Sequence, residues 1–88
     1  MCSGIYVKDI RENYGFTQKE FAFYFGVKLR TVQNWESRGC SENIYQLLNR
    51  CFWSDRARVV SDDNEKFRDF MRERIEHIKD IYSTENAW

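Results

Sequence analysis

The sequence predicts an all-α protein with five helices, the last of which is long and amphipathic. Three observations predict this class. The 88 residues include no proline and many residues that favour helices. Glycine, serine and threonine stand where helices would begin and end. Between these positions, apolar residues recur three or four places apart, which is the period of a helix with one buried face.

The first helix is predicted over residues 4–14, with Ser3 as its N-cap and with Val7 and Ile10 on its buried face. Gly15 ends this helix.

The second helix begins with Thr17 and Glu20, which form the pattern of a capping box. It stops at Gly26, a residue suited to the left-handed backbone of a tight turn. The third helix is predicted over residues 29–37 and ends near Gly39.

The fourth helix gives the cleanest amphipathic signal in the chain. Ser41 is its expected N-cap, and residues 52–60 follow it as a connector whose last residues could be extended. Its predicted apolar face has the spacing i, i+3, i+4, i+7, i+8 and consists of Ile44, Leu47, Leu48, Cys51 and Phe52.

The fifth helix is predicted to start at a second capping box, Asp62 with Glu65, and to end near residue 82. We interpret its charged face, including Arg72 and Lys79, as solvated and paired at i,i+3 and i,i+4. Its apolar stripe consists of Phe67, Phe70, Met71, Ile75, Ile78 and Tyr82.

Composition bounds the function only loosely. A chain of this length buries one modest core, so we expect one compact domain, or a domain with a tail element. The formal net charge is zero. Residues 1–54 contain seven basic and five acidic side chains, and residues 55–88 contain seven basic and nine acidic ones. This asymmetry is too weak to indicate nucleic-acid binding, so the motifs must carry that argument.

Several classes of protein are disfavoured. The sequence has no run of about 18 apolar residues and no signal peptide, so we expect a cytoplasmic protein without a membrane span. Its three cysteines are expected to be reduced, with Cys51 as a small core residue. One histidine and no paired cysteines argue against a metal site. No nucleophile set, phosphate loop or carboxylate cluster indicates an enzyme or a cofactor.

The informative segment is residues 16–36. It contains two short helices joined by a turn with a glycine, the geometry that presents a recognition helix to the DNA major groove. Ala22 is small where the two helices approach closely, and Val27 fills the space between them. Val32 and Trp35 give the third helix an apolar inner face. Its outer face is then polar and consists of Arg30, Thr31, Gln33 and Asn34.

The string Thr17-Gln18-x-Glu20-Phe21-Ala22, followed by Gly26-Val27 and by residues 30–36, resembles the Cro/CI-type (XRE) helix-turn-helix family. This family comprises phage repressors and many bacterial regulators and antitoxins, and the resemblance covers roughly residues 5–52. It implies a lambda-repressor-like fold, with residues 1–54 as the DNA-binding domain and residues 29–37 as the recognition helix. Double-stranded DNA is the implied partner.

The resemblance also implies roles for individual residues. Arg30 and Asn34 would be the main base readers, since arginine suits guanine and asparagine suits adenine. Gln18 would contact a phosphate and support the recognition helix. Arg11 and Glu36 would form a partly buried ion pair between the first and third helices. The remaining implied contacts to the groove or backbone are those of Lys28, Leu29, Thr31, Gln33 and Arg38.

Three departures from the family pattern stand out. Lys28 occupies the position of a usual Ser or Thr cap, so the recognition helix begins without a strong cap. The loop 37–40 lacks the usual basic, proline-containing run. Phe23 would point outward, so we expect the fifth helix or a second subunit to cover it.

Residues 55–88, the connector and fifth helix, have two possible uses. The apolar stripe could fold back on its own domain or pair with a second chain, and dimerisation is the preferred interpretation because the helix is long. We therefore expect a repressor-like regulator that binds a palindromic operator as a homodimer. The alternative is an antitoxin-type factor that neutralises a partner protein and binds DNA mainly for autoregulation.

Overall fold

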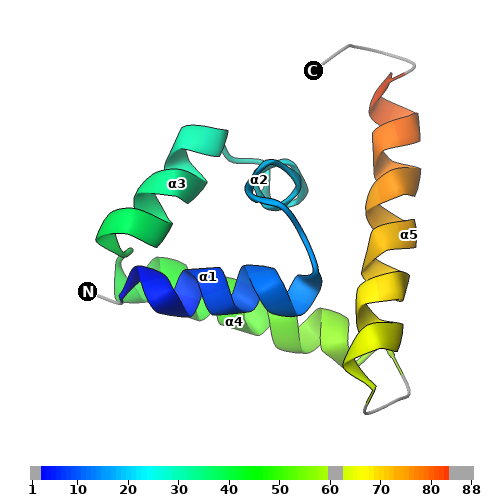
Figure 1. Cartoon of the computed structure of the whole chain (residues 1–88), viewed down its shortest axis with the longest axis horizontal. Coiled ribbons are helices and arrows are strands. Elements are labelled where there is room, and N and C mark those ends of the chain that lie inside the picture. The colour runs from blue at the N-terminus through cyan, green and yellow to red at the C-terminus, as the bar shows by residue number, and fades with distance from the viewer. Residues whose placement is uncertain (1–2, 60–62, 84–88) are drawn as a thin grey trace.

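A computed structural model describes residues 3–59 and 63–83, and of residues 81–83 it describes the backbone alone. The described residues form five α-helices and no strand, which confirms the all-α prediction (Figure 1). The helices are α1 (Gly4–Tyr14), α2 (Gln18–Phe25), α3 (Leu29–Arg38), α4 (Glu42–Arg56) and α5 (Asn64–Ser83).

The predicted N-caps are present at the starts of the first four helices, with one exception. The Ser3 hydroxyl accepts a hydrogen bond at the start of α1, and Ser41 does so for α4. Thr17 and Glu20 form the complete capping box of α2, with distances of 3.2 and 3.0 Å. Lys28 makes no side-chain cap for α3, as its departure from the family pattern implies.

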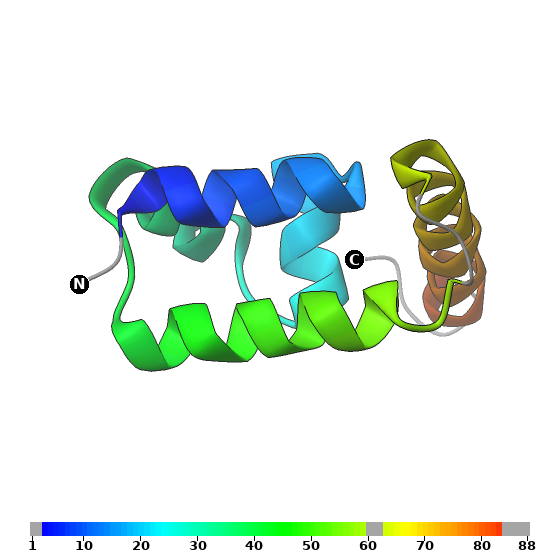
Figure 2. The same ribbon diagram turned by 90° about the horizontal axis from the view of Figure 1, so that it is seen from below.

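The helices form two layers with α5 at one end (Figures 1 and 2). α1 and α4 lie side by side, and α2 and α3 lie on one side of that pair. α5 crosses the end at which α1 finishes, and it packs against α1. The buried apolar side chains come from all five helices and the loops: Val7, Ile10, Tyr14, Phe16, Phe21, Ala22, Val32, Cys40, Leu48, Phe67, Met71 and Ile75.

The apolar stripe of α5 folds back on its own domain. Phe67, Met71 and Ile75 are buried within the single chain, whereas the expectation placed them against a second chain. The Phe67 ring lies 5.8 Å from the ring of Tyr14 and 5.5 Å from that of Phe52, measured between centroids. Helical periodicity shows which face is apolar but not which surface covers it, and here the domain's own aromatic core does so.

The other members of the stripe are less enclosed. Phe70 is 37% exposed, and Ile78 is half-buried. The side chain of Tyr82 lies outside the described residues.

The fourth helix corrects several predictions. α4 continues to Arg56, so the boundary drawn after residue 54 falls inside a helix. Cys51 and Leu47 are exposed, and of the two cysteines that the structure describes, Cys40 is the one buried in the core. The face of α4 that turns inward is shifted from the predicted one, because Leu48 and Asp55 are its buried residues.

The connector also differs from expectation where it is described. Residues 57–59 continue as hydrogen-bonded turns rather than extended chain. Asp62 lies outside the described residues, and the carboxylate that accepts from the Glu65 amide, at 2.9 Å, belongs to Asp63.

Candidate nucleic-acid interface

The turn between α2 and α3 depends on Gly26. Its φ of +70° is a left-handed conformation that only glycine adopts without strain. The amide of Val27 then donates to the carbonyl of Ala22 at 2.9 Å, which closes the end of α2. Val27 itself is half-buried against the core, as a residue between the two helices should be. The sequence thus sets the angle at which α3 leaves α2.

Helix α3 has one inner and one outer face. Val32 is fully buried and Trp35 packs against the core, which holds the helix to the domain. The residues predicted to touch DNA are distributed on the other side. Thr31 is half-buried, and the rest of the α3 set is exposed: Lys28, Leu29, Arg30, Gln33, Asn34 and Arg38. The four exposed positions between 29 and 34 recur at i, i+1, i+4 and i+5 and so share one surface, while Lys28 and Arg38 lie at the two ends of the helix.

An ion pair fixes the far side of α3. Arg11 Nε donates to Glu36 Oε2 at 2.7 Å and Arg11 Nη2 donates to Glu36 Oε1 at 3.2 Å, a bidentate arrangement. The Arg11 and Glu36 side chains are 15% and 8% exposed, so solvent screens this pair little. Gln18 Nε2 donates to the same Glu36 carboxylate at 3.2 Å. The structure therefore contains the ion pair that the resemblance implies, with Gln18 as a third member.

Gly4 lets α1 and α3 touch. A Cβ at this position would overlap the backbone carbonyl of Glu36 and crowd that of Trp35. The absence of a side chain thus sets how closely the last turn of α3 approaches α1. Sequence reasoning treated Gly4 only as the first helical residue, because close approach between backbones leaves no mark in periodicity.

The start of α3 is electropositive. With no side-chain cap, its first amides lack a side-chain acceptor, and the N-cap residue Lys28 is an exposed cation. Arg30 is exposed two residues further along. Amide dipoles and cations together favour an anion such as a phosphate group.

A second charged cluster joins α5 to the beginning of α2. Glu20 Oε2 accepts from Arg72 Nη1 and, at 3.2 Å, from Lys79 Nζ. Arg72 Nη2 donates to the carbonyl of Gly15 at 2.7 Å. Lys79 makes the predicted i,i+3 pair with Glu76, at 3.6 Å, but the prediction missed the contacts of Arg72 and Lys79 with Glu20 and Gly15. The capping box was the one sequence signal for this contact. It uses one oxygen of the Glu20 carboxylate and leaves the other free to accept a hydrogen bond from another element.

The ionisation of Glu20 reflects this cluster. Burial alone would raise the pKa of its carboxyl group. The hydrogen bonds from Arg72, from the Thr17 amide and from Lys79 outweigh burial and lower that pKa to about 2. Glu20 is consequently charged throughout the physiological range.

Asp55 is the centre of a third polar cluster, which sequence reasoning missed. Its Oδ2 accepts from the Tyr14 hydroxyl at 2.9 Å and from the Tyr24 hydroxyl at 2.8 Å. Burial, and then the hydrogen bond to Asp55, raises the pKa of both tyrosines, so both remain donors. The continuing stripe Leu48, Phe52, Asp55 could have revealed that Asp55 faces inward.

Phe23 and Tyr24 are less exposed than an isolated helix-turn-helix would leave them. Both are half-buried and pack against the core. The Arg74 guanidinium of α5 lies 6.0 Å from the centre of the Tyr24 ring. The fifth helix therefore shields Tyr24.

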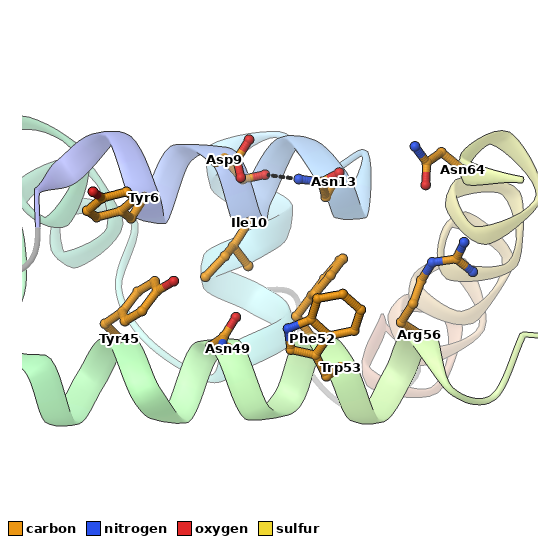
Figure 3. A pocket seen from close by; sticks show the side chains of 10 residues that line it. All are labelled: Tyr6, Asp9, Ile10, Asn13, Tyr45, Asn49, Phe52, Trp53, Arg56 and Asn64. Atoms are coloured by element: carbon orange, nitrogen blue, oxygen red, sulfur yellow. Dashed lines mark hydrogen bonds between the residues drawn. The ribbon is translucent and has the colours of Figure 1, made fainter. Parts of the chain in front are cut away.

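A groove opens on the opposite side of the molecule, and Figure 3 shows the side chains that line it. It has a volume of about 610 Å³ and runs between α1 and α4, on the side that faces away from α2 and α3. Tyr6 and Trp53 are 53% and 61% exposed at its walls. Ten residues line it: Tyr6, Asp9, Ile10, Asn13, Tyr45, Asn49, Phe52, Trp53, Arg56 and Asn64.

Metal-binding clusters and membrane-spanning helices are both missing from the described part of the chain. Among residues 3–59 and 63–83, no group of His, Cys, Asp and Glu is arranged to hold a metal ion. Within the same ranges, every helix is too short or too polar to span a membrane.

Comparison with known proteins bears on the first three helices. Residues 7–39 match a family model described as helix-turn-helix, which spans α1 to the end of α3. Comparison with curated proteins and with solved structures gives no match. The match coincides with the segment that contains the Gly26 turn and the exposed face of α3.

Proposed function

We propose that the protein is a sequence-specific DNA-binding transcription regulator that reads the major groove with the outer face of α3. One observation carries this proposal. Polar and basic side chains crowd the exposed face of a short helix, while Val32 packs into the core and the ion pair of Arg11 with Glu36 ties the last turn of that helix to α1. Discrimination among bases requires this combination, since a loosely held helix could not place donors at defined base edges.

The exposed groups suit defined partners. Arg30 offers a bidentate donor pair for guanine O6 and N7, and Asn34 offers a donor and an acceptor for adenine. Leu29, which is 40% exposed, provides an apolar contact for a thymine methyl group. Gln33 and Thr31 add base or phosphate contacts.

The backbone contacts would come from the edges of the motif. Lys28 at the start of α3 and Arg38 in its last turn are exposed cations that flank the reading face. Gln18, half-buried and bonded to Glu36, would present its remaining hydrogen-bonding capacity to a phosphate. These contacts fix the register of the helix and give affinity without specificity.

The proposal includes repression through a palindromic operator bound by two copies of the chain. Two recognition helices related by a two-fold axis match half-sites about 34 Å apart. Because Phe67, Met71 and Ile75 are buried within one chain, the interface has to use apolar residues that remain exposed, such as Phe70.

Selection of DNA from a random pool, followed by fluorescence anisotropy on the selected site, tests the proposal. We expect specific binding with a Kd on the order of 10⁻⁸ M and much weaker binding to scrambled DNA. Arg30→Ala should cost about 1–3 kcal/mol on the selected site and relax the preference at one base pair. Arg50→Ala is the matched control, since Arg50 is an exposed arginine on α4.

Two results would contradict the proposal. Failure to enrich any sequence would remove sequence-specific binding. Equal losses for Arg30→Ala on selected and scrambled DNA would assign Arg30 to the phosphate backbone instead of to a base.

A second candidate function, neutralisation of a partner protein, is favoured by the groove between α1 and α4. Its exposed Tyr6 and Trp53 are the residue types enriched at protein interfaces. The groove faces away from α3, so a partner bound there would leave the reading face open. Co-purification with the product of a neighbouring gene, lost in Trp53→Ala while DNA binding persists, would support this function.

A further inference from the structure

We infer that Arg72 and Lys79 of α5 are positioning residues for DNA binding, because they hold the loop from which α2 and the recognition helix are aligned. This inference rests on the proposed function. It concerns a set of hydrogen bonds that runs from α5 to α3 through the loop 15–17, between α1 and α2.

The first part of the set belongs to α5. Arg72 spans two elements, since one guanidinium nitrogen donates to the Gly15 carbonyl at 2.7 Å and another donates to Glu20. Lys79, seven residues and about two turns further along, donates to the same Glu20 oxygen at 3.2 Å. Two turns of α5 are therefore fastened to one carboxylate and one loop carbonyl.

The second part belongs to the recognition helix. Arg11 Nη1 donates to the Phe16 carbonyl at 2.9 Å, while its other nitrogens hold Glu36 of α3. Gln18 also donates to Glu36. The consecutive carbonyls of Gly15 and Phe16 are thus bound by two arginines, one from α5 and one that holds α3.

The middle of the set is the capping box. Glu20 Oε1 accepts from the Thr17 amide at 3.0 Å, and its other oxygen accepts from the two α5 cations. This carboxylate therefore joins α5 to the residue directly before Gln18. Displacement of α5 would release Gly15 and Glu20 together, so the loop would keep its contact with Arg11 but lose these contacts with α5.

Charge makes the same residues important for DNA. Glu20 lies two residues from Gln18, the proposed phosphate contact, and a bare carboxylate there would repel DNA. Its charge persists through the physiological range, so protonation does not relieve the repulsion. Arg72 and Lys79 neutralise it, and the Arg72 side chain is still 43% exposed toward solvent.

DNA binding by the full chain tests this inference on the site selected from random DNA. We expect Arg72→Ala to weaken specific binding about tenfold, and Lys79→Ala to weaken it by a smaller factor. Lys66→Ala is the control, since Lys66 is an exposed α5 cation and is expected to leave affinity nearly unchanged. Arg72→Lys keeps the charge but not the two-point geometry, so partial rescue is expected.

A double variant separates charge from position. Glu20→Gln keeps the capping-box acceptor, since glutamine also serves in that box. In the Arg72→Ala background it restores the net charge of the cluster, so we expect it to restore the salt dependence of binding but only part of the affinity. The unrestored part measures the loss of the contacts that α5 makes with Gly15 and with Glu20.

A second readout does not use DNA. The exchange rate of the Arg11 Nε proton, followed by NMR, reports on the contact with Glu36. We expect faster exchange in Arg72→Ala and in Lys79→Ala but not in Lys66→Ala. Unchanged exchange together with unchanged affinity would overturn the inference.

Failure of the proposed function gives a different pattern. If the wild-type chain selects no sequence, the proposal of sequence-specific DNA binding is wrong. The role of Arg72 and Lys79 in that binding is then wrong as well. If the wild type binds specifically and the Arg72 and Lys79 variants bind equally well, only the positioning role is overturned. The Lys79 variant keeps the test decisive should Arg72→Ala fail to fold.

Discussion

Two glycines shape the reading helix in different ways. Gly26 provides a left-handed φ of +70° in open space, with no atom within 4 Å of the place that a Cβ would occupy. Gly4 instead provides room, because a Cβ there would meet the backbone of Glu36. The first role could be predicted from sequence, since a glycine between two predicted helices marks a turn. The second could not, because it depends on two segments that lie over thirty residues apart in the chain.

The two roles predict different costs on substitution. Gly26→Ala should cost about 1–2 kcal/mol of stability, the penalty for a left-handed alanine. Gly4→Ala should cost about 1–3 kcal/mol as overpacking, and it should also disturb the last turn of α3. Chemical denaturation measures the costs, and DNA affinity measures the disturbance. A Gly4→Ala variant with wild-type stability would show that α1 and α3 can separate freely.

At the level of elements, the sequence predicts where the capped helices begin but not which surfaces the helices pack against. The capping box of α2 and the cap of α4 could be read from sequence, since each is set within four residues. The ion pair of Arg11 with Glu36 followed from family resemblance, because nothing local links residues 25 positions apart. Neither a local signal nor the family resemblance predicts how α5 packs. The sequence alone therefore predicts that its cations are solvated and that its apolar stripe pairs with a second chain.

The contact between α5 and α2 predicts a pH dependence. The pKa of Glu20 is about 2 in the folded chain, below its ordinary value of 4.5. A lowered folded-state pKa means that the contact stabilises fully above about pH 4.5 and is lost as pH falls toward 2. At neutral pH, Glu20→Gln should therefore lower the free energy of unfolding by about 1–3 kcal/mol, a range that allows for solvent screening at Arg72.

Denaturation of both chains between pH 7 and pH 2.5 measures this effect. The difference between wild type and Glu20→Gln should shrink steadily below pH 4.5. Glu12→Gln is the control, since Glu12 is exposed and its Lys8 contact of 3.9 Å is a surface pair. A Glu20 difference that stays constant down to pH 2.5 would show that its ionisation does not hold α5.

At the scale of the whole molecule, the domain is thin. Its shortest principal extent is 17 Å, against 36 and 35 Å along the other two axes. Few side chains can be fully enclosed in such a shape, and α5 supplies three of them, Phe67, Met71 and Ile75. The helix-turn-helix match ends at residue 39, so the segment that completes the core lies outside it. The core is thus divided between the matched segment and α5.

Two phenylalanines three residues apart on α5 test this division. Phe67 is 1% exposed and packs on Tyr14, Phe52 and the Arg56 guanidinium, whereas Phe70 is 37% exposed. Phe67→Ala should cost about 3–5 kcal/mol, a large share of the stability of so small a domain. Phe70→Ala should cost less than about 1 kcal/mol, because much of its ring is already in water.

Protein concentration separates the two possible reasons for the Phe67 cost. If Phe67 packs within its own chain, the loss of stability is the same from micromolar to hundreds of micromolar protein, because unfolding of one chain does not depend on mass action. If Phe67 instead joined two chains, the midpoint of unfolding would rise with concentration in wild type and the rise would vanish in Phe67→Ala. We expect the first result for Phe67. Because Phe70 remains exposed, any concentration dependence that the wild type shows should be reduced in Phe70→Ala, which would place the proposed dimer contact on the outer side of α5.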